Sequence, residues 1–162
     1  IIIAYNQVFK LPYTIIRPSA LYGERCISRR VGQIFIENAL FDKDIVIDGD
    51  GNEKLDFTYI EDLTDGILKI ISNVKSRNEI FNLTFGEGRK IKDLIKILKK
   101  FFPNLRVKYK KRDKLMPKRG KLNMIKAKKL LKFNPKWRLE EGYTNYIKWY
   151  LEFYKENLNK FK

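Results

Sequence analysis

Apolar positions along the chain follow two different periods, and segments with one period alternate with segments that have the other. Strands are predicted at residues 13–18, 44–48, 55–60, 79–85 and 106–110, either from short apolar runs or from apolar residues that alternate with polar ones. Apolar residues at a spacing of three and four, which predicts amphipathic helices, occupy residues 30–40, 61–71, 91–98, 124–131 and 139–154. Strands that alternate with helices are typical of an α/β fold.

The polar segments between these elements include a loop and a concentration of carboxylates. Residues 19–26 are predicted to form an irregular loop. Seven acidic residues lie within residues 47–67. Two of them, Glu61 and Asp62, begin a predicted helix, where each carboxylate stabilises the positive end of the helix dipole by about 0.3–1 kcal/mol. Part of this acidity is therefore explained by helix formation.

The composition is that of a globular protein that lacks histidine. The chain has 162 residues, of which 44% are hydrophobic and 33% charged, enough for one domain with a sizeable core. With no histidine and one cysteine, Cys26, the sequence excludes a Ser-His-Asp triad, a Cys-His pair, an intrachain disulfide and histidine-ligated zinc. No apolar run reaches the length of a membrane span and the first residues lack a signal-peptide pattern. We therefore expect a cytoplasmic protein without membrane association and without a metal site.

The formal net charge of +16 is concentrated in the second half of the chain. Residues 1–86 contain 10 basic and 12 acidic residues, whereas residues 87–162 contain 25 basic and 7 acidic residues. Such a charge attracts polyanions or phosphorylated ligands. The simpler interpretation is that these lysines cover solvated helix faces, because they fall between periodic apolar positions.

A nucleic-acid-binding module is an alternative that rests on this charge and on aromatic rings that could stack on bases. The rings belong to the last predicted helix and are Tyr143, Tyr146, Trp149, Tyr150 and Tyr154. Most of them have the spacing of a buried stripe, whereas stacking requires exposed rings. Nucleic acid is therefore an unfavoured partner.

Four segments, in this order, resemble one enzyme family. They are TIIRPSALYGE, GDGNEKLDFTYIEDLTDGI, IFNLTFGEGRKIKDLIKIL and RGKLNMIKAKKLLKFNPKWRLEEGYTNYIKWY. Together they resemble the carboxyl-terminal half of the extended short-chain dehydrogenase/reductase family. More narrowly, they are similar to the NAD-dependent epimerases and dehydratases that act on nucleotide-diphosphate sugars.

The resemblance implies the C-terminal part of a Rossmann-like fold with a small substrate-binding domain. Residues 1–86 would hold the last strands and helices of the cofactor domain, interleaved with segments of the substrate domain. Residues 87–162 would belong mainly to the substrate-binding domain.

The N-terminal NAD-binding half of that family has no counterpart in this chain. Its Gly-rich turn, which opens a helix and holds the NAD pyrophosphate, is not matched by the two-glycine turns at residues 49–51 and 86–88. Its catalytic Tyr precedes a Lys by four positions, whereas Tyr5 precedes Phe9 at that distance. We therefore expect no catalytic residue here, a site for NAD that lies mostly outside the chain, and an inactive fragment.

The resemblance also implies binding residues in three segments. Pro18, Ser19 and Ala20 would face the cofactor. The substrate ligands would be Ser19, Arg25, Arg29, Arg30, Val31 and Arg119. Arginine suits a diphosphate because its planar fork donates two parallel hydrogen bonds.

Two positions depart from the family pattern. Many relatives carry Asn at the position of Ala20 and Arg at the position of Leu55. The second departure removes one phosphate ligand, so Arg119 becomes the best-matched ligand that remains and Lys54 a weak alternative. Three further residues match the family pattern and are expected to be structural: Asp56, Tyr59 and Asp62.

The expected function follows from the resemblance. The intact protein would be an NAD-dependent enzyme, a homodimer that acts on a nucleotide-diphosphate sugar, and this chain would be its substrate-binding half. A 4-epimerase is favoured, because no additional acid–base residue for an elimination can be identified. A dehydratase, a decarboxylase and a noncatalytic remnant stay open.

A substrate half by itself has a physical difficulty. The strands at residues 13–18 and 79–85 should belong to a parallel sheet whose other strands are absent. Their edges and apolar faces would be exposed. We therefore expect poor solubility or tight association of the isolated chain.

Overall fold

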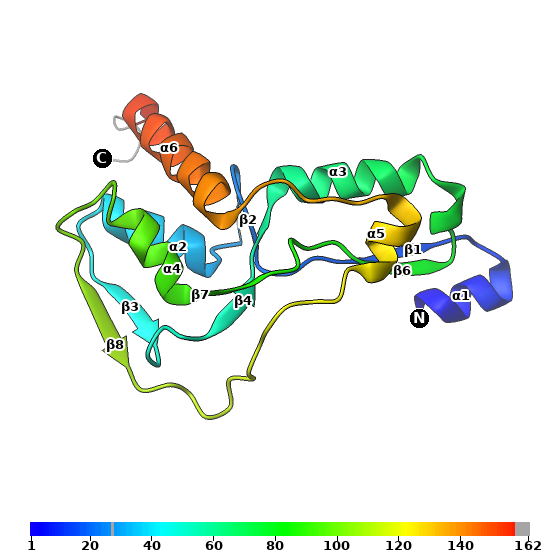
Figure 1. Cartoon of the computed structure of the whole chain (residues 1–162), viewed down its shortest axis with the longest axis horizontal. Helices are drawn as coiled ribbons and strands as arrows, with labels where there is room; N and C mark the ends of the chain where they lie inside the picture. The colour runs from blue at the N-terminus through cyan, green and yellow to red at the C-terminus, as the bar shows by residue number, and fades with distance from the viewer. Residues whose placement is uncertain (27, 158–162) are drawn as a thin grey trace.

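A computed structural model, which describes residues 1–26 and 28–157, shows two lobes around separate clusters of buried apolar side chains (Figure 1). The large lobe contains α2 (Val31–Leu40), α4 (Ile91–Leu98), α6 (Leu139–Asn157), β3 (Ile45–Asp48) and β8 (Val107–Lys110). The small lobe contains β1 (Thr14–Arg17), β6 (Glu79–Asn82), α3 (Ile60–Ile71) and α5 (Ile125–Leu131). The other elements are α1 (Ile2–Phe9), β2 (Leu21–Tyr22), β4 (Lys54–Asp56), β5 (Thr58–Tyr59), β7 (Gly88–Lys90) and the 3₁₀ turn η1 (Val74–Ser76).

Within the described residues the strands pair two by two. β1 pairs with β6, β2 with β5 and β3 with β8, all in parallel, and β4 pairs with β7 in antiparallel orientation. A parallel pair requires a long crossover connection, which is usually helical. These pairings bring together segments that are far apart in the sequence, and the predicted α/β fold is confirmed.

The predicted helices and most predicted strands occur near their expected bounds, with three differences in the strands. Residues 55–60 do not form one strand. The residues up to Asp56 pair with β7 as β4, and Thr58–Tyr59 then pair with β2 as β5. Residues 56–59 are all buried, which a single half-exposed strand would not allow. In addition, β2 lies inside the predicted loop 19–26, and Gly88 belongs to β7 instead of a turn.

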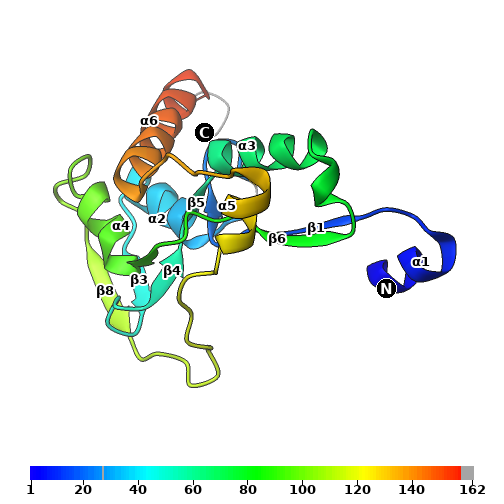
Figure 2. The ribbon, with the colours of Figure 1, turned by 45° about the vertical axis from the view of Figure 1, so that its right-hand side comes forward.

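Helix α1 has no counterpart among the predicted helices. None of its residues is buried, so its apolar side chains do not mark one face as they would on a helix packed against a core. The Asn6 side chain ties it to the small lobe by donating to the Leu11 carbonyl at 2.7 Å and to Asn78 Oδ1 at 3.1 Å. Otherwise α1 projects away from the rest of the molecule (Figure 2).

The core of the large lobe is built on one stripe of α6, which contacts α2 and α4. The stripe includes the fully buried side chains of Tyr143, Tyr146 and Ile147. The Tyr143 hydroxyl donates a hydrogen bond of 2.8 Å to the Gly32 carbonyl and so satisfies its polar atom inside the core. The apolar stripe predicted for the last helix is therefore the face that closes the large lobe.

The core of the small lobe lies between one face of the β1–β6 pair and the helices α3 and α5. Phe81 and Leu83 are fully buried there. Gly66 allows α3 to approach them closely, because a Cβ at this position would lie 2.8 Å from Leu83 Cδ1. The helices cover this face of the strands.

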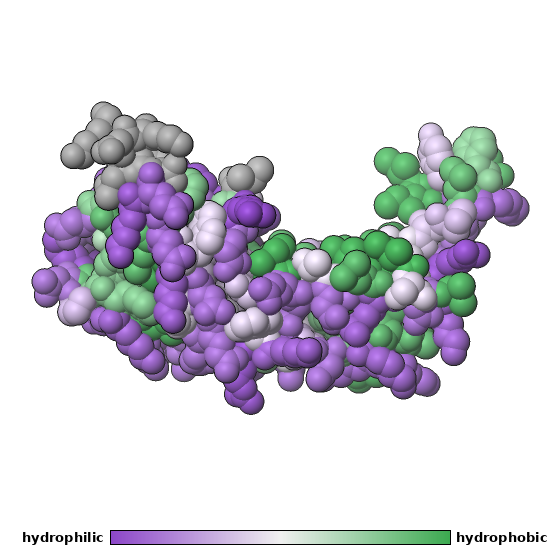
Figure 3. All heavy atoms as spheres, turned by 90° about the horizontal axis from the view of Figure 1, so that it is seen from above, coloured by the Kyte–Doolittle hydropathy of each residue, from purple (hydrophilic) through white to green (hydrophobic). Residues whose placement is uncertain are grey.

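Apolar side chains remain exposed on the outer side of the small lobe and on α1. Seen from above α3, they form a nearly continuous surface (Figure 3). Leu68 and Ile71 on α3 are 60% and 77% exposed, and Val8 and Phe9 on α1 are 69% and 61% exposed. Contiguous apolar surface of this kind marks an interaction site or an aggregation liability.

Candidate functional site

A pocket of about 450 Å³ lies in the large lobe; we call it the large pocket. One wall is the start of α2, a second is formed by β3 and β4, and a third comes from the long loop between β8 and α5. Its apolar floor includes Leu21, Val46, Leu55 and Phe57. Its charged lining residues are Arg29, Arg30, Asp48, Glu53 and Arg119. Its size is within the range of small-molecule sites.

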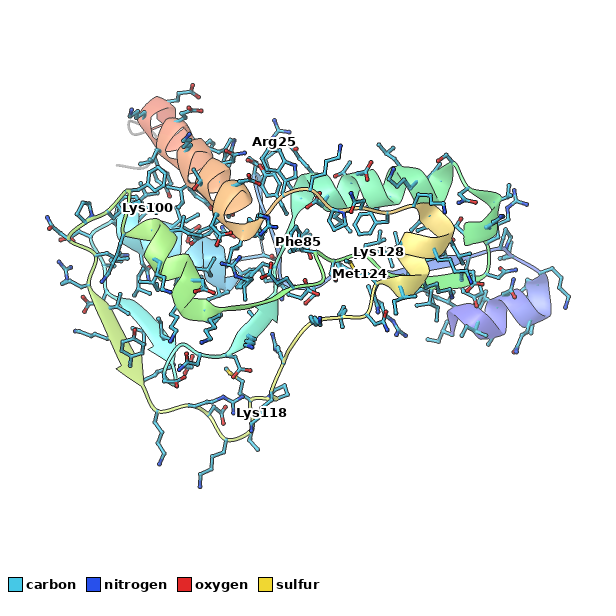
Figure 4. The ribbon with its side chains drawn as sticks, in the orientation of Figure 1. Arg25, Phe85, Lys100, Lys118, Met124 and Lys128 are labelled. Atoms are coloured by element: carbon cyan, nitrogen blue, oxygen red, sulfur yellow. The ribbon has the colours of Figure 1, made fainter. Side chains whose placement is uncertain are left out.

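The large pocket brings together five of the residues singled out from the sequence as binding residues. They are Ala20, Arg29, Arg30, Val31 and Arg119. Pro18 and Ser19 do not line it, since they follow β1 before the chain reaches the pocket. Arg25 does not line it either: it is exposed, beside α6, whereas Lys118 lies across the molecule on the loop that borders the pocket (Figure 4).

Two arginines stand at the positive end of α2. Arg30 is the N-cap residue of this helix, and its Nε lies 3.3 Å from Ser28 Oγ. The Arg29 backbone N–H donates to Gln33 Oε1 at 3.1 Å, and its guanidinium lies 3.5 Å from Glu37. Both side chains are exposed, so they can turn toward a ligand. Their charges add to that of the helix dipole and favour an anion at this wall.

A third arginine, Arg119, and two carboxylates, Asp48 and Glu53, also line the pocket. The Arg119 backbone N–H donates to Glu53 Oε1 at 3.2 Å. Glu53 Oε2 is 3.3 Å from Arg112 Nε, and Asp48 is 3.1 Å from Lys110 Nζ. Each of these two carboxylates is therefore paired with a cation, which limits its repulsion of an anionic ligand.

Glu53 and another lining residue, Met116, were not predicted from the sequence. Glu53 belongs to the acidic segment 47–67, whose carboxylates were interpreted as structural, and Met116 lies in a loop without periodicity. The proximity of Glu53 to the loop of residues 111–121, which follows β8, depends on the pairing of β3 with β8. No local pattern reports that pairing.

Asp56 and Asp62, two acidic residues that were predicted to be structural, bind backbone N–H groups of distant segments. Asp56 is buried and accepts hydrogen bonds from the backbone N–H groups of Gly86, at 2.9 Å, and Leu122, at 3.0 Å. Asp62 accepts from the backbone N–H groups of Lys136 and Trp137 at 2.7 and 3.1 Å. Burial raises the pKa of Asp62, although these two donors oppose the shift.

Tyr59 completes this set of structural contacts. Its hydroxyl donates to Glu24 at 2.5 Å, and its buried ring packs against Trp137. The contact joins β5 to the loop after β2, which leads into the arginine wall of the pocket.

The aromatic residues of α6 do not form a stacking platform. Tyr143, Tyr146 and Tyr150 are buried in the large lobe. Trp149 stacks on the neighbouring rings of Tyr146 and Phe153. This arrangement does not support the alternative of nucleic-acid binding through these rings.

The profile of the NAD dependent epimerase/dehydratase family matches residues 1–84, slightly more than half of the chain. The chain belongs to this family. The resemblance seen in the four sequence segments is thereby confirmed. No helix in residues 1–26 and 28–157 combines the length and hydropathy that crossing a bilayer requires.

Several relatives of this chain are named as sugar-nucleotide enzymes. The UDP-glucuronate 4-epimerase of Thermodesulfobacterium geofontis is 30% identical over 165 residues, which cover 98% of this chain and 48% of that protein. The crystal structure of Thermotoga maritima UDP-glucose 4-epimerase with UDP-glucose has a TM-score of 0.84 and 29% identity, over 94% of this chain and 50% of that one. UDP-glucuronic acid 4-epimerase from Bacillus cereus, in complex with UDP-glucuronic acid and NAD, has a TM-score of 0.86 and 28% identity, over 93% and 49%.

The chain thus spans about half the length of the curated relatives it matches. These neighbours confirm a Rossmann-like fold for the family and NAD as its cofactor.

The described residues of this epimerase/dehydratase family member fit only a small part of an NAD site. Its two-glycine turns lead into β4 and β7, so neither opens a helix that could hold the pyrophosphate. Pro18 and Ser19 lie at the carboxyl end of β1, beside the end of β6. In parallel sheets that end of the strands is where ligands bind. Residues 18–20, expected to face NAD, therefore follow the end of a parallel strand, where ligands commonly bind. No glycine turn among the described residues could hold the NAD pyrophosphate at the start of a helix.

The departure from the family pattern at Leu55 falls inside the large pocket. Leu55 is partly exposed and contributes apolar surface to the pocket. Lys54 is exposed and does not line the pocket. The cations that line it come from Arg29, Arg30 and Arg119 alone among the described residues.

Proposed function

We propose that this chain supplies the substrate-binding part of an NAD-dependent enzyme that acts on a nucleotide-diphosphate sugar, with 4-epimerisation as the reaction. The observation that carries the proposal is the large pocket, which combines apolar lining residues with arginines from two separate segments, the start of α2 and the loop between β8 and α5. The solved neighbours that resemble this chain include 4-epimerases with UDP-sugars bound. The whole protein would be a cytoplasmic homodimer.

The chemistry of the pocket suits a diphosphate flanked by less polar groups. Phosphate oxygens can accept charge-assisted hydrogen bonds from Arg29 and Arg30 at the start of α2 and from Arg119 on the loop of residues 111–121. Phe57 and Leu55 offer apolar surface to the base or the sugar. This arrangement would fix the orientation of the sugar, which is how binding residues contribute to rate.

NAD, when bound, would supply the hydride chemistry, which requires residues beyond those of this chain. Pro18, Ser19 and Ala20, between the end of β1 and the pocket, would face both cofactor and sugar. Ser19 would be the polar side chain of this group. We propose Arg25 as a ligand only if the loop that carries it moves toward the large pocket, because it lies outside the pocket here.

A titration of the 162-residue chain with UDP tests the proposal. We expect saturable binding by calorimetry and a loss of about tenfold or more in affinity for Arg119→Ala, since a charge-assisted hydrogen bond contributes roughly 1.5–3 kcal/mol. Arg77→Ala is the matched control, because Arg77 is exposed on the small lobe and does not line the pocket. Equal UDP affinity in both variants would contradict the proposed site.

The reaction is tested separately. The isolated chain, given NAD and UDP-glucose or UDP-glucuronate, is expected to form no epimer. Co-expression with the N-terminal half of the Thermotoga maritima relative is expected to restore epimerisation if the two halves assemble. Formation of a dehydrated or decarboxylated product in the same assay would replace 4-epimerisation as the proposed reaction.

A further inference from the structure

The loop of residues 111–121, which we call the basic loop, forms a wall of the large pocket through Met116 and Arg119. It contains no helix or strand, and Leu115 at its tip is 90% exposed. Its internal hydrogen bonds run from the N–H groups of Leu115 and Met116 to Asp113. These bonds shape the tip of the basic loop but do not attach it to the body of the molecule.

The contacts that attach the basic loop to the pocket meet at one carboxylate. Glu53 accepts the Arg119 backbone N–H on Oε1 at 3.2 Å and pairs through Oε2 with Arg112 Nε at 3.3 Å. Within residues 1–26 and 28–157, these are the hydrogen bonds and ion pairs that join the basic loop to the rest of the molecule. Asp56 binds the next residue, Leu122, just beyond the loop.

The burial of Glu53 and of its partner indicates that this carboxylate links the basic loop to the turn before β4, instead of being a solvated surface charge. Its side chain is 21% exposed and that of Arg112 is 30% exposed. The Arg112 side chain lies against the turn before β4, since a Cβ at Gly49 would be in ordinary van der Waals contact with that of Arg112, at 3.4 Å. Arg112 Nη2 is buried without a hydrogen-bond partner in the described residues, so Glu53 is the group that compensates this guanidinium.

We infer that Glu53 is a positioning residue, which holds the basic loop as a wall of the large pocket and thereby places Arg119 for a diphosphate. The role of Arg119 in this inference rests on the proposed function. Charge alone predicts the opposite effect of Glu53: a carboxylate in the lining of a pocket for a diphosphate repels the ligand, and its removal should strengthen binding. The positioning role predicts that its removal weakens binding. The sign of the change in affinity separates the two.

The experiment compares Glu53→Ala and Glu53→Gln with Asp50→Asn in the 162-residue chain. Asp50 lies in the same turn and bonds to Asn52 instead of the basic loop, so its variant removes one negative charge without loosening that loop. Trypsin cleavage after Lys114, Lys118 and Lys121 and amide exchange at Arg119 report the order of the loop without any ligand. UDP affinity reports its consequence for the pocket. Thermal unfolding confirms that each variant is folded, and Glu53→Gln replaces Glu53→Ala if the latter unfolds.

We expect cleavage of the basic loop and exchange at Arg119 to become about tenfold faster in Glu53→Ala, in keeping with the loss of hydrogen bonds to a charged group. UDP affinity should fall by about tenfold, with a smaller loss in Glu53→Gln. Asp50→Asn should leave loop protection unchanged.

Two results would overturn the inference: unchanged protection of the loop in both Glu53 variants, or UDP binding as tight as or tighter than in the wild-type chain. If the wild-type chain does not bind UDP, the proposed function fails, and the cleavage and exchange rates still decide whether Glu53 holds the loop.

Discussion

The two lobes solve the problem of burying apolar surface in different ways. In the large lobe, α2, α4 and α6 enclose a cluster that includes Phe35, Leu98 and Tyr143, and the cluster is closed by residues of this chain. In the small lobe, α3 and α5 cover one face of the β1–β6 pair, and neither strand has another partner among the described residues. Helix α1 beside them buries none of its residues.

The comparison shows that a closed core and a regular strand pairing are separate properties. The β1–β6 pair is in parallel register over Thr14–Arg17 and Glu79–Asn82, yet neither strand has another partner among the described residues, and of its apolar side chains only Phe81 is fully buried. Parallel sheets are normally covered on both faces. The large lobe, which holds the large pocket, also has a parallel pair without a further strand among the described residues, β3–β8, but its core is closed by α2, α4 and α6. Binding of a ligand in that pocket and integrity of the small lobe should therefore be separable in experiments.

The largest expected effect is on the core of the large lobe. Tyr143→Ala removes a fully buried ring and its hydrogen bond to Gly32. We expect a loss of about 3–5 kcal/mol in the free energy of unfolding, the range for an aromatic residue replaced by alanine in a core. Urea denaturation followed by circular dichroism measures it. The control is Tyr5→Ala on α1, where the ring is 55% exposed and a change below about 0.5 kcal/mol is expected. Similar losses in both would contradict the contrast in burial between the large lobe and α1.

A second, smaller effect is expected inside the small lobe. Gly66→Ala places a methyl group 2.8 Å from Leu83 Cδ1 and 3.0 Å from Phe133 Cε2, so these two side chains or α3 itself must shift. Overpacking of this kind costs about 1–3 kcal/mol. Hydrogen exchange should quicken at amides of β6 and α3, with amides of α6 less affected. Uniform acceleration across α6 as well would show that the two lobes unfold as one unit.

A third prediction concerns the exposed surface of the small lobe. Leu68→Lys combined with Ile71→Lys places two charges on a face where these side chains are 60% and 77% exposed. Because the chain is expected to associate through exposed apolar surface, we predict self-association weakened by about tenfold, as expected when burial of a few apolar groups is lost. Sedimentation measures the association. Lys substitutions at Glu87 and Arg77 serve as controls, since both positions are already exposed and polar. A monomeric wild-type chain would refute the prediction of association.

The smallest effect is electrostatic and belongs to the large lobe. Arg89 of β7 forms a two-pronged ion pair with Glu140 of α6 and lowers the pKa of Glu140 below its usual value of 4.5. A depressed carboxyl pKa contributes stability above the pKa of the unfolded chain, and this contribution is lost as pH falls through the lower pKa of the folded state. Because Glu140 is half exposed, we expect no more than about 1 kcal/mol.

The measurement is the melting temperature between neutral and acidic pH for the wild-type chain and Glu140→Gln. The variant should be less stable at neutral pH, and the difference should shrink below the ordinary pKa of a glutamate. Glu61→Gln is a matched control, since Glu61 is exposed in the first turn of another helix and forms no ion pair with the described residues. A difference that grows with acid would contradict the assigned sign.

Much of the local structure follows from the sequence, because it depends on short-range periodicity. The helices α3, α4 and α6 and the strands β1, β3 and β6 each have an apolar pattern that a few neighbouring residues determine. The acidic start of α3 and the apolar stripe of α6 follow in the same way. The strands β2 and β5 are too short for a pattern, and α1 has no buried face to impose one.

The site depended on tertiary structure to a greater degree. Resemblance to the family indicated Arg29, Arg30, Val31 and Arg119. Only the tertiary structure, in which the start of α2 and the basic loop line the same cavity, brought them to one pocket. The role of Glu53 exists only because β3 pairs with β8 and carries the basic loop to the turn before β4. Arg25 is an arginine like Arg29 and Arg30, but it lies outside the pocket. Periodicity reports which face of an element is buried, whereas the partner that buries it is selected by the long-range packing of the whole chain.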